Sequence, residues 1–208
     1  SRKKIISSKY ISCPGCYPTS ILLPLIPLIK SKKIKLNNII VDSKSGITGA
    51  GRNAKQDLIF AENYGSFKAY GNADHRHTPE IEHNIYLLTK QKVKITFVPH
   101  ILPINRGIMS TIYAIGKSSE IHKKLTEYYK NEKFVLINDF NEIPKISDVT
   151  GSNLCRIGVF SNQKNNTTII ISVIDNLVKG AAGQAIQNMN NVYSFQEDLG
   201  LDQVSYWP

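Results

Sequence analysis

Apolar residues recur at two spacings along the chain, and each spacing predicts a different kind of element. Repeats of three or four residues predict helices over residues 20–29, from Thr78 onward, over residues 118–129 and after Asp175. Short runs rich in Ile, Val and Phe predict strands over residues 5–12, 38–42, 93–98, 108–115, 134–137, 156–160 and 167–173. A turn-prone stretch at 162–166 joins the last two. Several strands follow one another without repeating strand–helix–strand units, so we predict an α+β fold with a mixed, largely antiparallel sheet flanked by helices.

The last predicted helix has an unusual composition. Asp175 is a good N-terminal cap, and one face carries a stripe of small or apolar residues: Val178, Ala181, Ala182, Ala185 and Met189. Gly180 and Gly183 interrupt the same segment, and glycine destabilises a helix interior by about 1 kcal/mol relative to alanine. These glycines make sense only where another part of the protein packs close against the helix.

Composition and charge narrow the class of protein. Of the 208 residues, 41% are hydrophobic, which excludes a disordered chain. The longest apolar run, residues 21–29, contains two prolines, so we expect no membrane-spanning segment. Three cysteines cannot form a disulfide framework and suit the reducing cytoplasm. The net charge of +10 favours a nucleic-acid partner, but no nucleic-acid-binding motif accompanies it, so an inactive basic binding module stays an alternative.

Cys13-Pro14-Gly15-Cys16 admits four interpretations. A zinc site needs more ligands, and Cys155 is the only other thiol. A thioredoxin-like redox pair fits two cysteines at the start of a helix. Cys16 alone fits a nucleophile, because the dipole and the free backbone N–H groups of a helix start lower the pKa of a thiol. A buried structural cysteine is the fourth possibility.

Two histidines flank an arginine in His75-Arg76-His77, just before a predicted helix start. Such a cluster suits an anionic ligand, because a helix start presents free N–H groups and a positive dipole end. One imidazole could also serve as a general acid or base near neutral pH. A solvated turn is the alternative interpretation.

The glycine-rich stretch 46–52 is a second candidate for ligand binding. It contains a short dinucleotide-binding fingerprint, Gly49-x-Gly51-x-x-Ala54, but lacks the parallel strand that should follow within a nucleotide-binding unit. We therefore interpret it as a loop whose N–H groups approach a ligand. Arg52 at its end, and Arg106 between two predicted strands, are candidate clamps for a carboxylate or phosphate.

Six segments carry a resemblance to a known family: PGCYPT at 14–19, SGITGAGR at 45–52, HRHTPEI at 75–81, FVPH at 97–100 with PINRG at 103–107, GSN at 151–153 and DNLVKGAAGQAIQNMN at 175–190. In this order they resemble N-acetyl-γ-glutamyl-phosphate reductase, the NADP-dependent enzyme of arginine biosynthesis. The segments cover almost the whole chain. The resemblance implies a homo-oligomer, and a fold similar to the C-terminal domain of glyceraldehyde-3-phosphate and aspartate-semialdehyde dehydrogenases.

The resemblance also implies a reaction and the residues that perform it. Cys16 would attack the acyl phosphate of N-acetylglutamyl phosphate and expel phosphate, and NADPH would reduce the thioester to the semialdehyde, with His75 as general acid/base. The substrate-binding residues would be Arg52, Tyr70, Arg76, His77 and Arg106. The cofactor-binding residues would be Ser45, Gly46, Gly49 and Asn176. Among these residues, Arg52, Arg76, His77 and Arg106 are the positive groups that bear on function, and they face a small anionic metabolite. Neither nucleic acid nor membrane is therefore the expected partner.

The chain departs from the family in two ways. The family enzyme begins with an NADP-binding Rossmann domain, which this sequence does not contain. We therefore expect residues 1–174 to form the catalytic, substrate-binding and dimerisation domain. Residues 175–208 would pack on that missing or separate domain, so this chain alone would be nearly inactive and its glycine stripe partly uncovered. Cys13 stands where family members commonly carry no thiol, which raises the hypothesis of an inactivating Cys13–Cys16 disulfide. An acyl-phosphate reductase of the aspartate-semialdehyde dehydrogenase type is the alternative enzyme.

Overall fold

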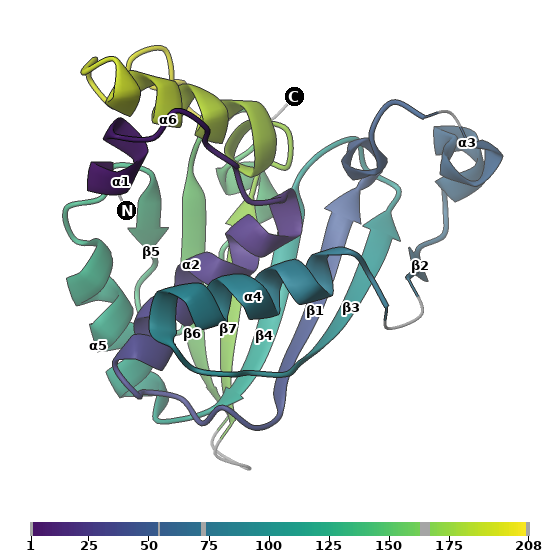
Figure 1. Cartoon of the computed structure of the whole chain (residues 1–208). Helices are drawn as coiled ribbons and strands as arrows, with labels where there is room; N and C mark the ends of the chain where they lie inside the picture. Colours follow the sequence, from purple (N-terminus) through teal and green to yellow (C-terminus); the bar gives the residue numbers. More distant parts are fainter. Residues whose placement is uncertain (1, 54, 72–73, 163–166, 207–208) are drawn as a thin grey trace.

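The computed structural model describes residues 2–53, 55–71, 74–162 and 167–206, and a seven-stranded sheet forms its centre (Figure 1). The strands are β1 (Ile39–Gly46), β2 (Lys68–Ala69), β3 (Ile95–Leu102), β4 (Ile108–Ile115), β5 (Val135–Ile137), β6 (Cys155–Asn162) and β7 (Thr167–Ile174). The α-helices are α1 (Arg2–Ile6), α2 (Cys16–Lys30), α3 (Phe60–Asn63), α4 (His77–Thr89), α5 (Ser118–Tyr129) and α6 (Gly183–Val192). The shorter turns are the 3-10 turns η1 (Ile47–Ala50), η2 (Gln56–Leu58) and η3 (Ile146–Asp148), and the π-helical turn η4 (Val178–Ala182).

The sheet is mixed, with the strand order β2-β3-β1-β4-β7-β6-β5. β1 pairs with β3 and β5 with β6 in parallel, whereas the other neighbours pair antiparallel. The predicted mixed, largely antiparallel sheet is therefore confirmed. β2, which follows the glycine-rich loop, is antiparallel to β3, so the fingerprint there does not begin a Rossmann unit. Ala54, the last residue of that fingerprint, lies outside the described residues. The same is true of positions 163–166 in the turn predicted over residues 162–166.

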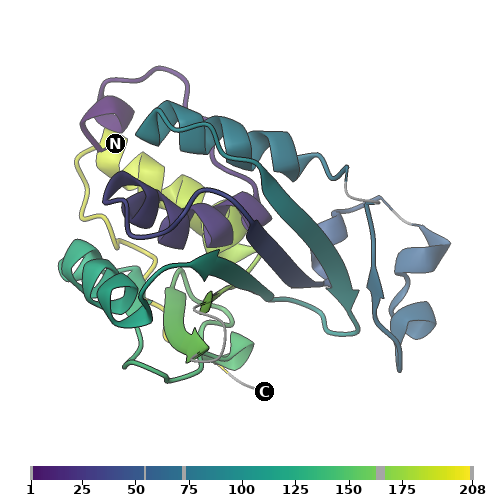
Figure 2. The same ribbon diagram turned by 90° about the horizontal axis from the view of Figure 1, so that it is seen from below.

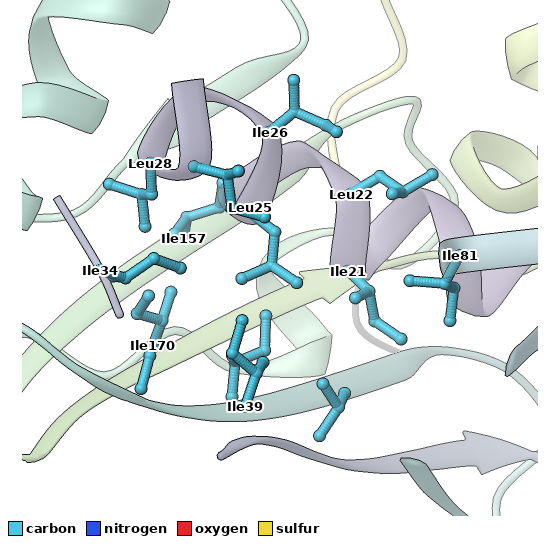
Figure 3. Packing of buried hydrophobic residues seen from close by; sticks show 14 of the residues in the cluster. Ile21, Leu22, Leu25, Ile26, Leu28, Ile34, Ile39, Ile81, Ile157 and Ile170 are labelled. Atoms are coloured by element: carbon cyan, nitrogen blue, oxygen red, sulfur yellow. The ribbon is translucent and has the colours of Figure 1, made fainter. Parts of the chain in front are cut away.

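Helices α2, α4 and α5 cover one face of the sheet, as Figure 2 shows from below. α2 is almost wholly buried, and its Ile21, Leu25 and Leu28 have no exposed surface. They pack with Ile39 and Ile170 of the sheet in one core (Figure 3). Each such side chain stabilises the fold by about 1.5–3 kcal/mol, so the core holds α2 firmly. Across the described residues, no helix has the length and apolar character that crossing a bilayer requires.

The opposite face of the sheet carries no long helix among the described residues (Figure 2). Four apolar side chains lie in register across β1, β4, β7 and β6 on this face: Ile40, Tyr113, Ile169 and Phe160. Ile40 is 41% exposed, and the other three are half-buried. Their neighbours along each strand point to the helix-covered face, because side chains alternate along a strand. The row is therefore an apolar surface without a helix to cover it.

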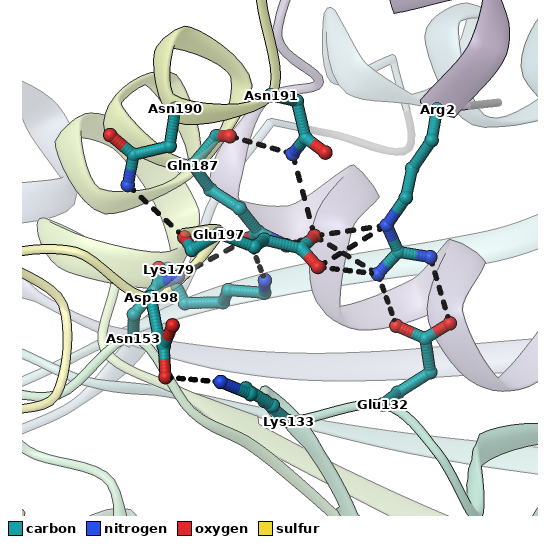
Figure 4. Close-up of polar contacts among 10 residues, drawn as sticks. All are labelled: Arg2, Glu132, Lys133, Asn153, Lys179, Gln187, Asn190, Asn191, Glu197 and Asp198. Carbon is teal, nitrogen blue, oxygen red and sulfur yellow. Dashed lines mark hydrogen bonds and ion pairs between the residues drawn. The ribbon is translucent and has the colours of Figure 1, made fainter. Parts of the chain in front are cut away.

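Residues 5–12 do not form the predicted strand, because the chain begins with α1 and continues without a strand to α2. Arg2 donates to Oε1 of Glu132 at 3.0 Å and to Oε1 of Glu197 at 3.1 Å (Figure 4). These ion pairs hold the segment beside α5 and the C-terminal tail. Ile6 and Ile11 stay exposed. The prediction was wrong because strand propensity is realised only where a neighbouring strand offers a partner.

Asp175 caps the last helical segment from before its start at Val178, as predicted: its Oδ1 accepts the N–H groups of Leu177 at 2.8 Å and Val178 at 3.2 Å. The expectation that the glycines would be partly uncovered is wrong, because Gly180 and Gly183 are both buried. The segment thus has a glycine face inside and an apolar face toward solvent. The exposed residues of that outer face are Ala181, Ala182, Ala185, Ile186 and Met189.

Candidate active site

Cys16 is the first residue of α2, and the local sequence favours a helix start at this point. Gly15 is the N-cap in an extended conformation (φ −60°, ψ 166°), and its carbonyl accepts the N–H of Thr19 at 2.9 Å. Pro18 lies in the first turn, where a missing N–H costs no hydrogen bond. Oε1 of Glu80 on α4 accepts the Gly15 N–H at 2.9 Å. The turn that carries Cys16 is therefore fixed to both helices.

Opposing effects act on the pKa of the half-buried Cys16 thiol. Burial raises the pKa, and the charge of Glu80 raises it further. The backbone N–H groups of Tyr17 and Cys16 itself lower it, as does the charge of Arg76. The result is a pKa above the ordinary value of 9.0. The N–H groups at the helix start are the donors that can stabilise a thiolate once it forms.

His75 and His77 are neighbours, with ring centroids 4.8 Å apart. The N–H of His77 donates to Nδ1 of His75 at 3.1 Å. Because Nδ1 accepts this bond, neutral His75 carries its proton on Nε2. Burial, with a smaller effect of Arg76, lowers the pKa of His75 below 6.5, and burial lowers the pKa of His77 to about 4. Both rings are neutral at pH 7, and His75 can donate a hydrogen bond through Nε2.

Three aromatic rings surround His75. The centroid distances are 5.8 Å to Tyr17, 5.4 Å to Tyr70 and 5.5 Å to Phe97. The hydroxyl of Tyr70 donates to the hydroxyl of Tyr17 at 3.2 Å, and that hydroxyl donates to the carbonyl of His100 at 3.2 Å. These contacts fix the orientation of the imidazole ring. Tyr70, predicted to bind substrate, lines the cavity with its hydroxyl proton already engaged.

A cavity of about 360 Å³ opens beside the histidines. Its lining brings together six of the predicted site residues: Ser45, Gly46, Gly49, Tyr70, His75 and Arg76. They come from the end of β1, the loop after it, and the segment before α4. Ligand pockets span about 300–1,000 Å³, so this one suits a small metabolite or one end of a larger cofactor.

Four polar residues that line the cavity were not predicted from the sequence: Asn53, Lys55, Asp57 and Lys68. Nζ of Lys68 lies 3.6 Å from Oδ2 of Asp57, the acidic residue of the lining. Lys55, Lys68 and Arg76 together exceed that single carboxylate, so the cavity favours an anionic ligand. Exposed lysines in loops leave no periodic pattern. The one available signal was that Lys55 follows Arg52 closely in the loop already singled out.

Arg106 and Asn176 do not line this cavity but hold the strands around it. Nε of Arg106 lies 2.8 Å from Oδ2 of Asp175, which has no exposed surface. Oδ1 of Asn176 accepts the N–H of Gly107 at 2.6 Å, and its Nδ2 donates to Oγ1 of Thr48 at 3.0 Å. The predicted anion clamp and the predicted cofactor contact are thus both engaged with the protein itself. They join the end of β7 to the glycine-rich loop.

The remaining predicted residues occupy two different environments. The ring of His77 is buried against the loop before Cys16, where a Cβ on Gly15 would lie 2.6 Å from Nε2. A glycine is therefore required next to the candidate nucleophile. Arg52 is exposed beyond η1, on the loop that borders the cavity. It can reach a ligand only from the solvent side.

Cys13 and Cys16 face separate points of the segment that follows β7. Sγ of Cys13 lies 3.3 Å from Nδ2 of Asn188, whereas Cys16 packs against Gly180. Eight helical residues span about 12 Å, but a disulfide needs Cβ atoms about 4 Å apart. All three cysteines are free. The hypothesised disulfide would therefore require the chain before α2 to move, and it stays a prediction.

The chain is similar in sequence to a set of enzymes. Residues 16–176 match the family model of the semialdehyde dehydrogenase dimerisation domain. The N-acetyl-gamma-glutamyl-phosphate reductase of Clostridium botulinum is 49% identical over 99% of this chain and 61% of its own length. Those of Ehrlichia canis and Staphylococcus saprophyticus are each 45% identical, over 98% and 97% of this chain and 60% of their own length. The chain thus spans about 60% of the length of these relatives.

Solved structures show the same fold at low sequence identity. A probable aspartate-semialdehyde dehydrogenase from Pseudomonas aeruginosa superposes with a TM-score of 0.71, at 14% identity, over 93% of this chain and 66% of that one. Aspartate semialdehyde dehydrogenase II from Vibrio cholerae gives 0.69 at 14% identity, over 88% and 62%. These structures confirm the predicted α+β architecture. Because the family model matches most of its length, the chain belongs to the semialdehyde dehydrogenase dimerisation-domain family.

Proposed function

We propose that this chain is the catalytic portion of an NADPH-dependent reductase that converts N-acetylglutamyl 5-phosphate to N-acetylglutamate 5-semialdehyde, a step of arginine biosynthesis. The observation that carries the proposal is the position of Cys16 at the start of a buried helix, where the charge of Arg76 acts on its thiol. Arg76 in turn lines the cavity together with neutral His75 and an excess of cations. A thiol nucleophile, an acid and an anion site are the parts that this reaction needs. Identities of 45–49% to reductases of that name support the substrate.

The first step is acyl transfer to Cys16. The thiol loses its proton to solvent, the thiolate attacks the acyl carbon, the carbon–oxygen bond to phosphate breaks, and a thioester forms. Lys55, Lys68 and Arg76 offset the negative charge of the leaving phosphate. His75 donates a hydrogen bond from Nε2 to the carbonyl oxygen, which becomes negative during the attack. The neutral state of His75 suits this task, since a proton stays on Nε2 throughout.

The second step is reduction of the thioester, for which bound NADPH would supply the hydride. The loop 45–49 fits the nicotinamide end, because Gly49 is exposed beside the cavity and a Cβ there would come within 2.5 Å of Oγ of Ser45. The cavity is too small to enclose a whole dinucleotide. His75 supplies a proton to the oxygen of the reduced carbon, which gives a hemithioacetal. His75 then takes this proton back as the carbon–sulfur bond breaks, so the semialdehyde is released and Cys16 departs as the thiolate.

The exposed face of η4 and α6 receives the nucleotide-binding part of the enzyme in this proposal. Residues 1–174 are then the catalytic and dimerisation unit, and residues 175–208 are the contact segment. The small side chains of Ala181, Ala182 and Ala185 allow a partner to approach the helix closely, and the exposed Met189 adds apolar area. The greater length of the relatives is consistent with such a part.

A second copy of the chain covers the open sheet face in this proposal. The family model describes a dimerisation domain, and the apolar row centred on Tyr113 and Ile169 is the extended uncovered surface of the sheet. Ile169→Glu should convert the oligomer to a monomer in size-exclusion chromatography with light scattering. Ile186→Glu, which places the same charge on the exposed face of α6, should leave the oligomer intact. An unchanged oligomer in Ile169→Glu would show that the interface lies on another surface.

A second candidate is an acyl-phosphate reductase of the aspartate-semialdehyde dehydrogenase type, favoured by the likeness of fold to two such enzymes. Both candidates use the same thiol chemistry, so they differ only in the acyl group that the cavity accepts. The protein acts in the cytoplasm in either case, where its three free cysteines stay reduced.

Acylation of Cys16 tests the proposal without the cofactor. The chain mixed with N-acetylglutamyl phosphate should release one equivalent of phosphate and gain the mass of an acetylglutamyl group on Cys16. Cys16→Ala should release phosphate only at the rate of spontaneous hydrolysis. Aspartyl phosphate serves as the competing substrate, and a preference for it would favour the second candidate. Absence of an adduct on Cys16 with both acyl phosphates would contradict the proposal.

A further inference from the structure

Gly180 packs directly against the residue that carries the proposed chemistry. A Cβ on Gly180 would lie 2.8 Å from Cβ and 3.2 Å from Cα of Cys16. No side-chain rotation can move these two atoms, so a larger residue at position 180 must displace η4 or the first turn of α2. Gly180 does not have a positive φ, unlike Gly51 or Gly151. Close approach to Cys16, rather than backbone conformation, therefore accounts for this glycine.

The π-helical turn η4 brings Gly180 to this position. The N–H of Gly180 donates to the carbonyl of Asp175 at 2.9 Å, and the N–H of Ala182 donates to that of Leu177 at 3.0 Å, each five residues back. Single π-turns are rare and frequently lie at functional sites. In this one Gly180 faces α2, while Ala181 and Ala182 face solvent.

Both ends of the contact are anchored by hydrogen bonds. Asp175, at the start of the turn, accepts the N–H of Gly151 at 2.7 Å and is paired with Arg106. One turn beyond Gly180, Nε2 of Gln184 donates to Oγ1 of Thr19 at 3.0 Å. Thr19 belongs to the first turn of α2, as Cys16 does. The turn η4 cannot withdraw from Cys16 without breaking these bonds.

We propose that Gly180 is a positioning residue, whose backbone holds the first turn of α2 so that the Cys16 thiol stays beside its N–H donors and the cavity. The inference rests on the proposed function in one respect, that Cys16 is the nucleophile. The outer face of the same turn is the proposed docking surface, so the turn lies between that surface and the thiol.

Gly180→Ala and Gly183→Ala form a matched pair that tests this role. Each adds one methyl group to a buried glycine of the same segment, but a Cβ at position 183 meets Oδ1 of Asn153 at 2.5 Å and Val178 rather than Cys16. The readout is the rate of Cys16 alkylation by iodoacetamide between pH 6.5 and 9.5, resolved by peptide mass spectrometry, with Cys13 as internal reference. Gly180→Ala should slow Cys16 about fivefold or more and move its pH midpoint upward, whereas Gly183→Ala should change it less than about twofold.

A double-variant cycle keeps the test decisive if Gly180→Ala is unstable. Cys16→Gly removes the Cβ that the new methyl group would meet, so Gly180→Ala should lower Tm by at most half as much in that background as in the parent chain. Equal effects of Gly180→Ala and Gly183→Ala on alkylation, or an equal fall in Tm in both backgrounds, would overturn the proposal. Neither readout involves acyl phosphate, so the proposed function could fail while this inference stands, and the reverse.

Discussion

The turn that carries Cys16 and the strand start that carries Cys155 both remove a thiol from water, and burial raises the pKa of both thiols, but different groups oppose the effect of burial. Cys155 has no exposed surface, and burial raises the pKa of its thiol to about 11. Cys16 is half-buried, and its own backbone N–H, that of Tyr17 and the charge of Arg76 counteract the effect of burial. The difference lies in what opposes desolvation.

Backbone geometry explains why only Cys16 is helped by backbone N–H groups, whereas the effects that lower the pKa of Cys155 come from the side chains of Ser172 and Lys179. The N–H of Cys155 is used in pairing, since it donates to the carbonyl of Phe134 at 2.8 Å. The first N–H groups of a helix have no partner within the helix, so those around Cys16 are free to bind a thiolate. A buried helix start beside a cavity can therefore host reactive sulfur, whereas a buried strand start produces an inert core cysteine.

The largest expected difference comes from replacing each cysteine with alanine. Cys16→Ala should lower phosphate release from N-acetylglutamyl phosphate by about 10³-fold or more, because the attacking atom is gone. Cys155→Ala should leave that rate within about twofold, because Cys155 lies in the core away from the cavity lining. Single-turnover phosphate assays measure both. A comparable loss in the two variants would show that the distinction between the thiols is wrong.

His75 sharpens the comparison, because its ring packs against Tyr17, the residue that follows Cys16. His75→Ala removes the Nε2 donor from the cavity and should slow acylation of Cys16 by about 10²-fold. His83→Ala is the matched control, since His83 is an exposed histidine on α4, the helix that follows His75. Its rate should equal that of the parent chain. If His75→Ala also acylated at the parent rate, the oxygen of the substrate would have to be stabilised by another group.

The buried thiol of Cys155 should affect the pH dependence of the free energy of unfolding and not the activity. Its thiol titrates near pH 9 in the unfolded chain and near 11 in the folded one, so the unfolded chain loses its proton first as pH rises. The free energy of unfolding should therefore be unaffected by this group below pH 9 and fall by up to about 2.7 kcal/mol by pH 11. Urea titrations of the parent and of Cys155→Ala isolate the effect as a difference. Parallel pH curves for the two proteins would contradict the assignment.

Local patterns predicted most elements, and the failures have a physical cause. The helix over residues 118–129 and the strand over residues 108–115 appear with the predicted bounds. In both, the spacing of apolar residues within the segment itself defines the face that is buried in the core. The strand predicted over residues 5–12 was wrong because the conformation of this segment depends on the ion pairs of Arg2 with Glu132 and Glu197, which are far away in the sequence.

The candidate site divides in the same way. The positions of Cys16 and His75 at helix starts could be predicted, because the residues next to them in the sequence are typical of a helix cap and first turn. The pairing of Arg106 with Asp175 was not, because it depends on Ile108 of β4 lying in register with Ile174 of β7. The residues next to that pair meet only once the sheet has formed.

The smallest effects concern the two charges that act on Cys16 from α4 and its entry. Arg76→Gln removes the charge that lowers the pKa of the thiol, so less thiolate forms at pH 8 and alkylation should slow about two- to threefold. Glu80→Gln removes a charge that raises this pKa, while its amide oxygen can still accept the Gly15 N–H. Alkylation should then become faster by a similar factor. The measurement is the pH profile of the iodoacetamide reaction at Cys16.

The opposite signs make this pair more informative than either change alone. A general loosening of the turn would alter both variants in one direction, whereas electrostatic control requires one to slow and the other to quicken. Salt provides the second control, because Arg76 is exposed and its influence should shrink as ionic strength rises toward 1 M, where the screening length is about 3 Å. Cys155 should show no response to either substitution in the folded chain, since neither Arg76 nor Glu80 is among the groups that act on its pKa. If both variants moved alkylation the same way, the substitutions would be acting through the structure of the turn and not through charge.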